Sequence, residues 1–342
     1  MDSYHGRVDG VPASVTVGPQ TLDAGGRMLA YVDMDSVHVA GYAISIGMHP
    51  SDGLEVTGLG PRHDAFLTDL DAARSAARRA ALLQWTGRPE RGSFVQNPGA
   101  PGENLVRVHV FDDGLTVEPR NGTPQIVPFA LVDSVERDGY TITLRLRSSD
   151  PVTVRRLGPR TDEFVALLDR LRADERQAVA AAYGAIDDRL LGYAAPNGWA
   201  VATADAGTFG GALADAFCGG DRAADLAPLI AAAAGLRFGL SLQVDEPMPF
   251  LLATGRSTTA VESLGDEARA TYVFATTDTD ALNRALIMTS FRREAFYLPE
   301  DQLGRWSLAA RTLDVVRWAR SVFRQRIVHD DNWAGAVASA LQ

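Results

Sequence analysis

Short runs of alternating apolar and polar residues, separated by Gly, Pro, Asp or Asn, dominate the first half of the chain. Within Tyr42–Met48 the large side chains fall on every second position, which is typical of a strand with one buried face. This pattern predicts antiparallel strands joined by tight turns at Ala13–Val17, Arg27–Asp33, Ser36–Ala40, Tyr42–Met48 and Leu54–Leu59. The apolar period then changes to three and four residues, which predicts a helix capped by Asp64 and ending near Trp85.

A Gly- and Pro-rich stretch, residues 86–104, separates this unit from a second one with the same plan. The second unit begins with a hairpin signal at Asp112-Asp113-Gly114. Its predicted strands are Val106–Phe111, Leu115–Glu118, Gln125–Phe129, Val132–Glu136, Tyr140–Arg147 and Val152–Leu157. A helix capped by Thr161 or Asp162 follows and extends toward Tyr183.

The two units are copies of one sequence. Residues 35–74 align with residues 133–172 without a gap at an offset of 98, and 18 of the 40 positions are identical. Such self-similarity indicates an internal duplication. The shared residues include Leu59-Gly60-Pro61-Arg62, repeated at Leu157-Gly158-Pro159-Arg160, and are mostly turn formers, sheet hydrophobes and helix caps. We therefore expect that the duplication copied a fold and no polar site.

Each unit has about six or seven short strands and one closing helix. In the second unit this succession is Pro128-Phe129, Val132-Asp133-Ser134-Val135, Tyr140–Leu144, Val152-Thr153-Val154 and the helix from Thr161. The arrangement resembles the pleckstrin-homology-like (PH-like) fold. The Gly-rich start of the first copy departs from it. The resemblance implies a bent antiparallel sheet plugged by a helix, and a fold that hosts lipid, peptide and protein ligands.

The remaining residues, 184–342, predict a mixed α/β region. Ala-rich segments come first, and strands follow at Phe238–Val244, Phe250–Thr254 and Thr271–Thr276. A helix capped by Asp278 or Thr279 then runs to Met288, and a last helix is predicted from Arg305 to Phe323. Because Thr279-Asp280 aligns with Thr161-Asp162, a third, diverged copy is an alternative interpretation. The expected organisation is a leader at 1–12, PH-like units at 13–85 and 105–183 around the linker 86–104, and the region 184–342. The fold class is α+β.

Composition narrows the chemistry. All 33 basic residues are Arg, which points to a GC-rich bacterial genome such as that of an actinobacterium and excludes Schiff-base, PLP and phosphate-loop lysine chemistry. A net charge of −10 disfavours nucleic acid and anionic lipid. The single Cys218 can form no internal disulfide and is expected to be a small buried side chain, with a reactive thiol as the alternative. Without a signal peptide or a long apolar run, we expect a cytoplasmic protein.

The sequence contains no nucleophile elbow, no zinc-ligand spacing and no phosphate-binding glycine loop, so we expect no catalytic residue, no cofactor and no metal. The six histidines show no ligand spacing. His329-Asp330-Asp331 is interpreted as a solvated chain end, with cation binding as the alternative. Leu-Gly-Pro-Arg is interpreted as the turn that directs the chain into the helix. A repeated anion contact by Arg62 and Arg160 is its alternative.

Residues 292–326 hold eight arginines against four acidic residues. Arg317, Arg320 and Arg324 are expected to line one side of the last helix. They are interpreted as part of an ordinary amphipathic helix whose arginines pair with the acidic surface elsewhere, and a docking face for an acidic partner is the alternative. The PH-like hairpin loop, which is basic in phosphoinositide-binding members of the fold, is acidic here at Asp112-Asp113. Lipid binding by the repeats is therefore disfavoured.

These features lead us to expect a non-enzymatic protein-interaction scaffold. One alternative is an enzyme or ligand-binding protein with a pocket between the C-terminal region and the repeats, where Arg256, Ser257, Thr258 and Thr259 form a polar loop. The other is a peripheral membrane adaptor that uses the Arg-rich helix.

Overall fold

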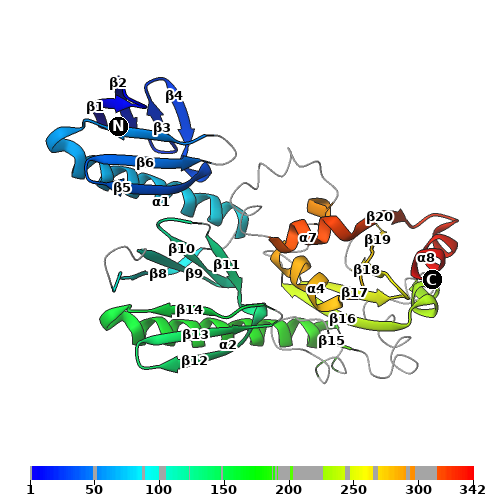
Figure 1. The fold of residues 1–342 in the computed structure, drawn as a ribbon. Coiled ribbons are helices and arrows are strands. Elements are labelled where there is room, and N and C mark those ends of the chain that lie inside the picture. The colour runs from blue at the N-terminus through cyan, green and yellow to red at the C-terminus, as the bar shows by residue number, and fades with distance from the viewer. Residues whose placement is uncertain are drawn as a thin grey trace. The chain divides into compact units, whose positions relative to one another are not determined.

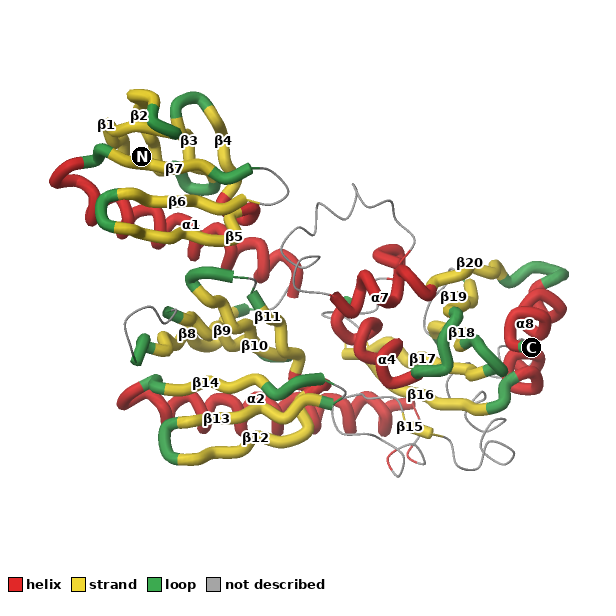
Figure 2. Tube along the Cα trace, in the orientation of Figure 1, coloured by secondary structure: helices red, strands yellow, loops and turns green. Residues whose placement is uncertain are grey.

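A computed structural model describes residues 2–48, 52–86, 89–99, 105–122, 124–147, 149–186, 188, 191, 201–202, 226–242, 247–264, 269–289, 293–296 and 314–342. Cys218, the linker residues 100–104 and the first part of the last predicted helix lie outside these ranges. The chain divides into two compact units, which are described separately: Met1–Ile126 with Val154–Thr161 and Glu300–Thr312, and Val127–Thr153 with Asp162–Pro299 and Leu313–Gln342. Figures 1 and 2 show the elements along the chain.

The first copy is a seven-stranded antiparallel sheet with one long helix, α1 (His63–Thr86). The sheet order is β4-β3-β2-β1-β7-β6-β5. The strands are β1 (Asp2–Val8), β2 (Val11–Val17), β3 (Thr21–Ala24), β4 (Arg27–Ala30), β5 (Met34–Ala40), β6 (Ala43–Met48) and β7 (Leu54–Thr57). The helix and the five strands predicted for residues 13–85 are present, but the strand predicted at Arg27–Asp33 ends at Ala30 and is followed by a 3-10 turn, Tyr31–Asp33. Strand β3 was not predicted. The leader predicted at 1–12 is wrong, because β1 pairs with β2 from Asp2 opposite Val17 to Val8 opposite Val11.

Strand β1 also joins the two halves of this sheet. Its end pairs with β7 at Arg7 opposite Thr57 and Val8 opposite Val56. The alternating pattern turns one face of the strands inward, where Tyr4, Ile44 and Ile46 pack with Phe66 and Leu70 of α1 in one buried cluster. Burial of the helix stripe against both halves of the sheet therefore closes the copy.

The second copy repeats every one of these elements in the same order. They are β8 (Glu90–Gln96), β9 (Val106–Phe111), β10 (Gly114–Pro119), β11 (Gln125–Pro128), β12 (Val132–Asp138), β13 (Thr141–Leu146), β14 (Val152–Arg155) and α2 (Thr161–Ile186). They form one sheet of order β11-β10-β9-β8 and another of order β12-β13-β14. Strand β8 lies inside the stretch predicted to be a linker, so that prediction is wrong for residues 90–96.

Two local irregularities are also repeated. The pairing of β5 with β6 shifts register between Met34 and Ser36, and that of β12 with β13 shifts between Val132 and Ser134. The bulged residues are Asp35 and its counterpart Asp133, and a bulge re-aims the backbone at that point. The Gly-Pro turn before each helix has its glycine in the left-handed region, with φ of 54° at Gly60 and 62° at Gly158. This agrees with the interpretation of Leu-Gly-Pro-Arg as the turn into the helix.

The C-terminal region contains a six-stranded antiparallel sheet whose strands follow chain order. They are β15 (Val201–Ala202), β16 (Gly235–Leu242), β17 (Pro247–Thr254), β18 (Thr259–Ser263), β19 (Ala270–Phe274) and β20 (Phe323–Val328). Both faces are buried. Phe238, Leu251 and Val273 pack with α8 (Trp333–Leu341), and alternate residues such as Phe250, Leu252 and Phe274 pack with α4 (Thr279–Met288) and α7 (Asp314–Val322). Val179, Ala182 and Tyr183, near the end of α2, join the α8 side.

This strand order differs from that of the two copies, so the described residues do not form the third copy considered from the sequence. The cap of α4 is confirmed, because the backbone N–H of Ala281 donates to Asp278 Oδ1 at 2.9 Å. The last predicted helix is wrong at its end: α7 stops at Val322 and the chain continues as β20. No described helix has both the length and the apolar character needed to cross a membrane.

Candidate functional site

Arg62 and Arg160, the arginines of the repeated turn, make the same contacts in their own copies. Arg62 Nη1 donates to the carbonyl of Ser3 at 2.9 Å, and its guanidinium lies 4.3 Å from the centre of the Tyr4 ring. Arg160 Nη1 donates to the carbonyl of Ser93 at 2.7 Å and lies 4.4 Å from the Phe94 ring. Each arginine thus ties the first strand of its copy to the turn before the helix, a structural role that accounts for its repetition. An anion contact by these groups stays a prediction.

The three arginines of the predicted C-terminal face do not share one helix. Arg317 and Arg320 lie on α7, exposed and half-buried, whereas Arg324 lies on β20, where it is exposed. Strand β20 is the last strand of its sheet and also carries exposed Arg326. The basic residues therefore lie on a helix end and on a strand, and the prediction that the three arginines line one helix is wrong.

Two arginines that sequence reasoning did not single out are buried on α1. Arg74 and Arg78 are 3% and 1% exposed. Arg74 Nη2 donates to the carbonyls of Met34 at 2.8 Å and Asp35 at 3.2 Å, and its Nη1 donates to the carbonyl of Arg120. Burial, and then the neighbouring charge of Arg78, lower the pKa of Arg74 to about 9, so it remains charged at neutral pH.

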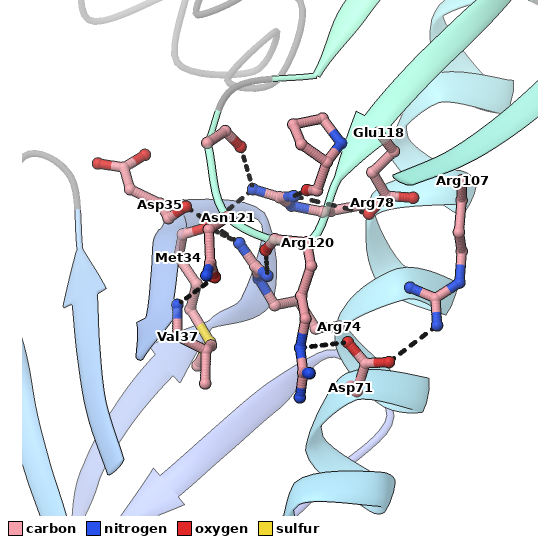
Figure 3. Close-up of polar contacts among 12 residues, drawn as sticks. Met34, Asp35, Val37, Asp71, Arg74, Arg78, Arg107, Glu118, Arg120 and Asn121 are labelled. Carbon is pink, nitrogen blue, oxygen red and sulfur yellow. Dashed lines mark hydrogen bonds and ion pairs between the residues drawn. The ribbon is translucent and has the colours of Figure 1, made fainter. Parts of the chain in front are cut away.

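Arg78 continues the same set of contacts one turn along the helix (Figure 3). Its Nη2 donates to the carbonyls of Met34 at 2.9 Å and Gly122 at 3.4 Å, and its Nη1 donates to that of Pro119 at 3.4 Å. Nη1 also lies 3.6 Å from Oε1 of Glu118, whose side chain is nearly buried. Carbonyl oxygens and one carboxylate thus satisfy a charge that would otherwise be costly to bury.

Three of the carbonyls that accept hydrogen bonds from these arginines belong to a turn of the second copy, residues 119–122. This turn packs against the edge of the first copy. The N–H of Gly122 donates to the carbonyl of Asp35 at 3.0 Å. The N–H of Val37, on edge strand β5, donates to Oδ1 of Asn121 at 3.0 Å.

An acidic residue of α1 contacts the cations beside this turn. The carboxylate of Asp71 lies 3.5 Å from Nε of Arg120 and 2.8 Å from Nη2 of Arg107. We call Met34, Asp35, Val37, Asp71, Arg74 and Arg78 the first edge site.

Behind the turn, Glu118 also contacts a buried histidine. His109 is 1% exposed, its Nδ1 lies 3.0 Å from Oε1 of Glu90, and its Nε2 lies 3.4 Å from Oε2 of Glu118. Burial by itself lowers the pKa of His109, but the hydrogen bonds and charges of Glu118 and Glu90 outweigh it and raise that pKa. The described residues contain no cluster of side chains suited to a metal ion.

The polar part of the first edge site is duplicated, contrary to the expectation that the repeat carries no polar site. At the offset of 98, Asp71, Arg74 and Arg78 correspond to Asp169, Arg172 and Arg176. Arg172 is 7% exposed and its Nη2 donates to the carbonyl of Val132 at 3.2 Å, which repeats the contact of Arg74 with Met34. We call Val132, Asp133, Val135, Asp169, Arg172 and Arg176 the second edge site. The identity of these three charged residues between the copies is the sequence signal that could have revealed the duplicated polar site.

A second buried polar cluster lies in the C-terminal region. Glu262 is fully buried, and its Oε2 accepts a hydrogen bond of 2.7 Å from Thr271 Oγ1, which accepts one of 2.9 Å from Trp333 Nε1. His329 Nε2 lies 3.1 Å from Glu262 Oε1, and its ring stacks on that of Trp333 with the centres 4.1 Å apart. The interpretation of His329 as a solvated chain end is therefore wrong, because the residue is packed into this cluster.

The polar loop predicted at Arg256–Thr259 holds the end of α8. The N–H of Arg256 donates to the carbonyl of Leu341 at 2.9 Å, and Thr258 Oγ1 donates to that of Ala340 at 2.6 Å. Thr259 is fully buried and its hydroxyl donates to the carbonyl of Thr276 at 2.7 Å. These bonds satisfy carbonyls at a helix C-terminus, which is a structural task.

No protein-family model, curated protein or solved structure matches this chain. The arrangement that the described residues offer is one edge site holding a protein turn and a second edge site with the same charged residues.

Proposed function

We propose that the protein is a non-enzymatic protein-interaction scaffold built on tandem PH-like units in the cytoplasm of a bacterium. The PH-like assignment is supported by the repeated order of seven strands and one terminal helix. The observation that carries the function is the first edge site, where a sheet edge and buried arginines hold a protein turn. A surface that binds main-chain carbonyls and one amide side chain recognises protein segments by their backbone.

The basic residues of the C-terminal region supply a second contact for an acidic partner. Arg317, Arg320 and Arg324 would lie at the rim of that contact, where charge mainly steers association and sets its salt dependence. In such a scaffold the first edge site holds the two copies together, and exposed surfaces of the protein bind the partners.

The test compares two readouts on the same full-length protein. Affinity purification from the native host, with replicate controls, should return specific protein partners, and a metabolite library should give no thermal shift. A clear thermal shift without any specific partner would contradict the scaffold and favour the ligand-binding alternative. Salt-sensitive binding to anionic vesicles, lost on joint replacement of the three arginines, would instead favour the membrane adaptor.

A further inference from the structure

We propose that the second edge site docks a reverse turn of a partner protein, in the same way that the first edge site docks the turn 119–122. The partner turn would carry a basic residue followed by Asn and Gly. This inference rests on the proposed scaffold function and names the partner segment that one of its surfaces recognises.

The first edge site defines what such a turn must offer. Its guanidinium groups take three turn carbonyls, those of Pro119, Arg120 and Gly122. The outward N–H of Val37 takes the side-chain oxygen of Asn121, and the Asp71 carboxylate lies against the basic Arg120. The site is thus selective for a short turn with outward carbonyls, an amide side chain and a cation.

The second edge site presents the same groups in the same register. Val135 lies opposite Leu144 as Val37 lies opposite Ile46, after the same bulge, so its N–H points away from the neighbouring strand. Strand β12 is also at the end of its sheet. The N–H of Val135, the carbonyl of Asp133 and the carboxylate of Asp169 therefore form a set of donors and acceptors equivalent to that of the first edge site.

Burial differs between the two sites in the manner expected for one covered and one uncovered surface. Val37 and Arg78 are buried under the turn, whereas Val135 is half-buried and Arg176 is exposed. Asp133 and Asp169 are also exposed. Arg172 is 7% exposed, and the structure shows one carbonyl bond for it among the described residues, to Val132. Its counterpart Arg74 donates to three carbonyls, those of Met34, Asp35 and Arg120, although Nε has no acceptor among the described residues in either arginine. Arg172 therefore makes the contact within its own copy that Arg74 makes with Met34, and lacks the contact that Arg74 makes with the turn.

A second copy of this chain does not supply the matching turn. The counterpart of 119–122 in the first copy is the tight β3–β4 hairpin at Gly25-Gly26, which has no side chain to reach Val135 or Asp169. The turn 119–122 itself is already held within its own chain. The occupant that fits is therefore a turn of a different protein.

The chain's own turn provides the probe. A backbone-cyclised peptide of residues 117–125 would be titrated by fluorescence polarisation into the full-length protein, in which the first edge site is filled by the chain itself. We expect saturable binding, about tenfold weaker for a peptide with Asn121→Ala because one hydrogen bond is lost. This control changes the peptide alone and leaves the protein's folding untouched.

Two protein variants locate the binding. Val135→Pro removes the outward N–H on an edge strand, where proline is tolerated, and Arg176→Met removes an exposed cation. Each should weaken the peptide about tenfold, and Asn121→Ala in the peptide should cost nothing further on the Val135→Pro protein, because both remove the same hydrogen bond. Circular dichroism and unfolding curves check that both variants fold.

The possible outcomes separate this inference from the scaffold function. No binding of the peptide, or additive losses from Asn121→Ala and Val135→Pro, would overturn the docking inference. Specific partners retained by both variants would leave the scaffold in place and overturn the edge site as their receptor. Concentration-dependent dimerisation abolished by Val135→Pro, measured by light scattering, would overturn a foreign partner in favour of a second copy of this chain.

Discussion

Replacement of Arg78 by Met is the sharpest test of how the first edge site holds the turn 119–122. The change keeps most of the apolar stem of a side chain that is 1% exposed but removes its donors to three carbonyls. The nearly buried Glu118 then keeps two cations nearby, His109, whose Nε2 lies 3.4 Å from Oε2, and the more distant charge of Arg74. Removing one partner of a buried ion pair costs about 3–5 kcal/mol, since the other charge is left without compensation.

This loss is expected to be local, so hydrogen exchange with mass spectrometry is the suitable assay. Amides that the turn protects, such as those of Val37 and Gly122, should exchange about 100-fold faster or more, which is what about 3 kcal/mol corresponds to. Urea unfolding should show a destabilised transition for the first compact unit. The loss should grow as pH rises, because His109, which contacts Glu118, is then deprotonated.

Arg176→Met is the matched control, because the residue occupies the same helical position in the second copy and is exposed. In the absence of a partner it should change stability by less than about 0.5 kcal/mol. A loss below about 1 kcal/mol for Arg78→Met, with unchanged exchange at Val37, is the size expected of a surface pair. That result would refute the reasoning, since it would mean that the turn leaves the edge site in solution.

Three further predictions follow from the described contacts. The pKa of His109 is raised in the folded state. Its contribution to stability is therefore full below the unfolded pKa of about 6.5 and is lost as pH rises through the folded pKa. The variant His109→Gln should remove this pH dependence from the free energy of unfolding, measured in urea across that pH range. Arg62→Leu and Arg160→Leu should each cost about 0.5–1 kcal/mol in urea unfolding, and equal costs would indicate equivalent roles. Thr271→Val should cost about 1–3 kcal/mol and shift tryptophan emission, because Trp333 and Glu262 lose the hydroxyl between them; an unchanged protein would contradict the buried network.

Residue patterns were sufficient for elements whose buried face is regular. Alternation in residues 42–48 and the three- and four-residue period after Asp64 predicted β6 and α1, and the offset of 98 predicted a second set of the same elements. The sequence pattern did not predict strands β1 and β8, because each has few buried apolar residues; in β8 the buried residue is Phe94. Pairing with neighbouring strands and an arginine stacked on an aromatic ring hold them, and neither leaves a periodic signal.

Tertiary contacts also decided the strand that ends the C-terminal sheet. The stretch around Val322 and Phe323 continues a helical apolar stripe, but Phe323–Val328 pairs with β19 from Phe274 to Ala270. Edge pairing satisfies the backbone groups of β19, a gain that local periodicity does not register. His329 likewise reads as a polar chain end, and only the fold brings it against Glu262 and Trp333.

The sequence by itself determined that one fold was copied and that Asp71, Arg74 and Arg78 recur as Asp169, Arg172 and Arg176. Only the tertiary structure decided what these charges do. In the first copy the turn 119–122 supplies carbonyls and Glu118, on the strand before it, supplies a carboxylate, so the arginines are buried and serve to join the copies. In the second copy the exposed Arg176 carries the same charge at the same helical position. Identical residues therefore have different environments, because burial and hydrogen bonding depend on which segment packs against them.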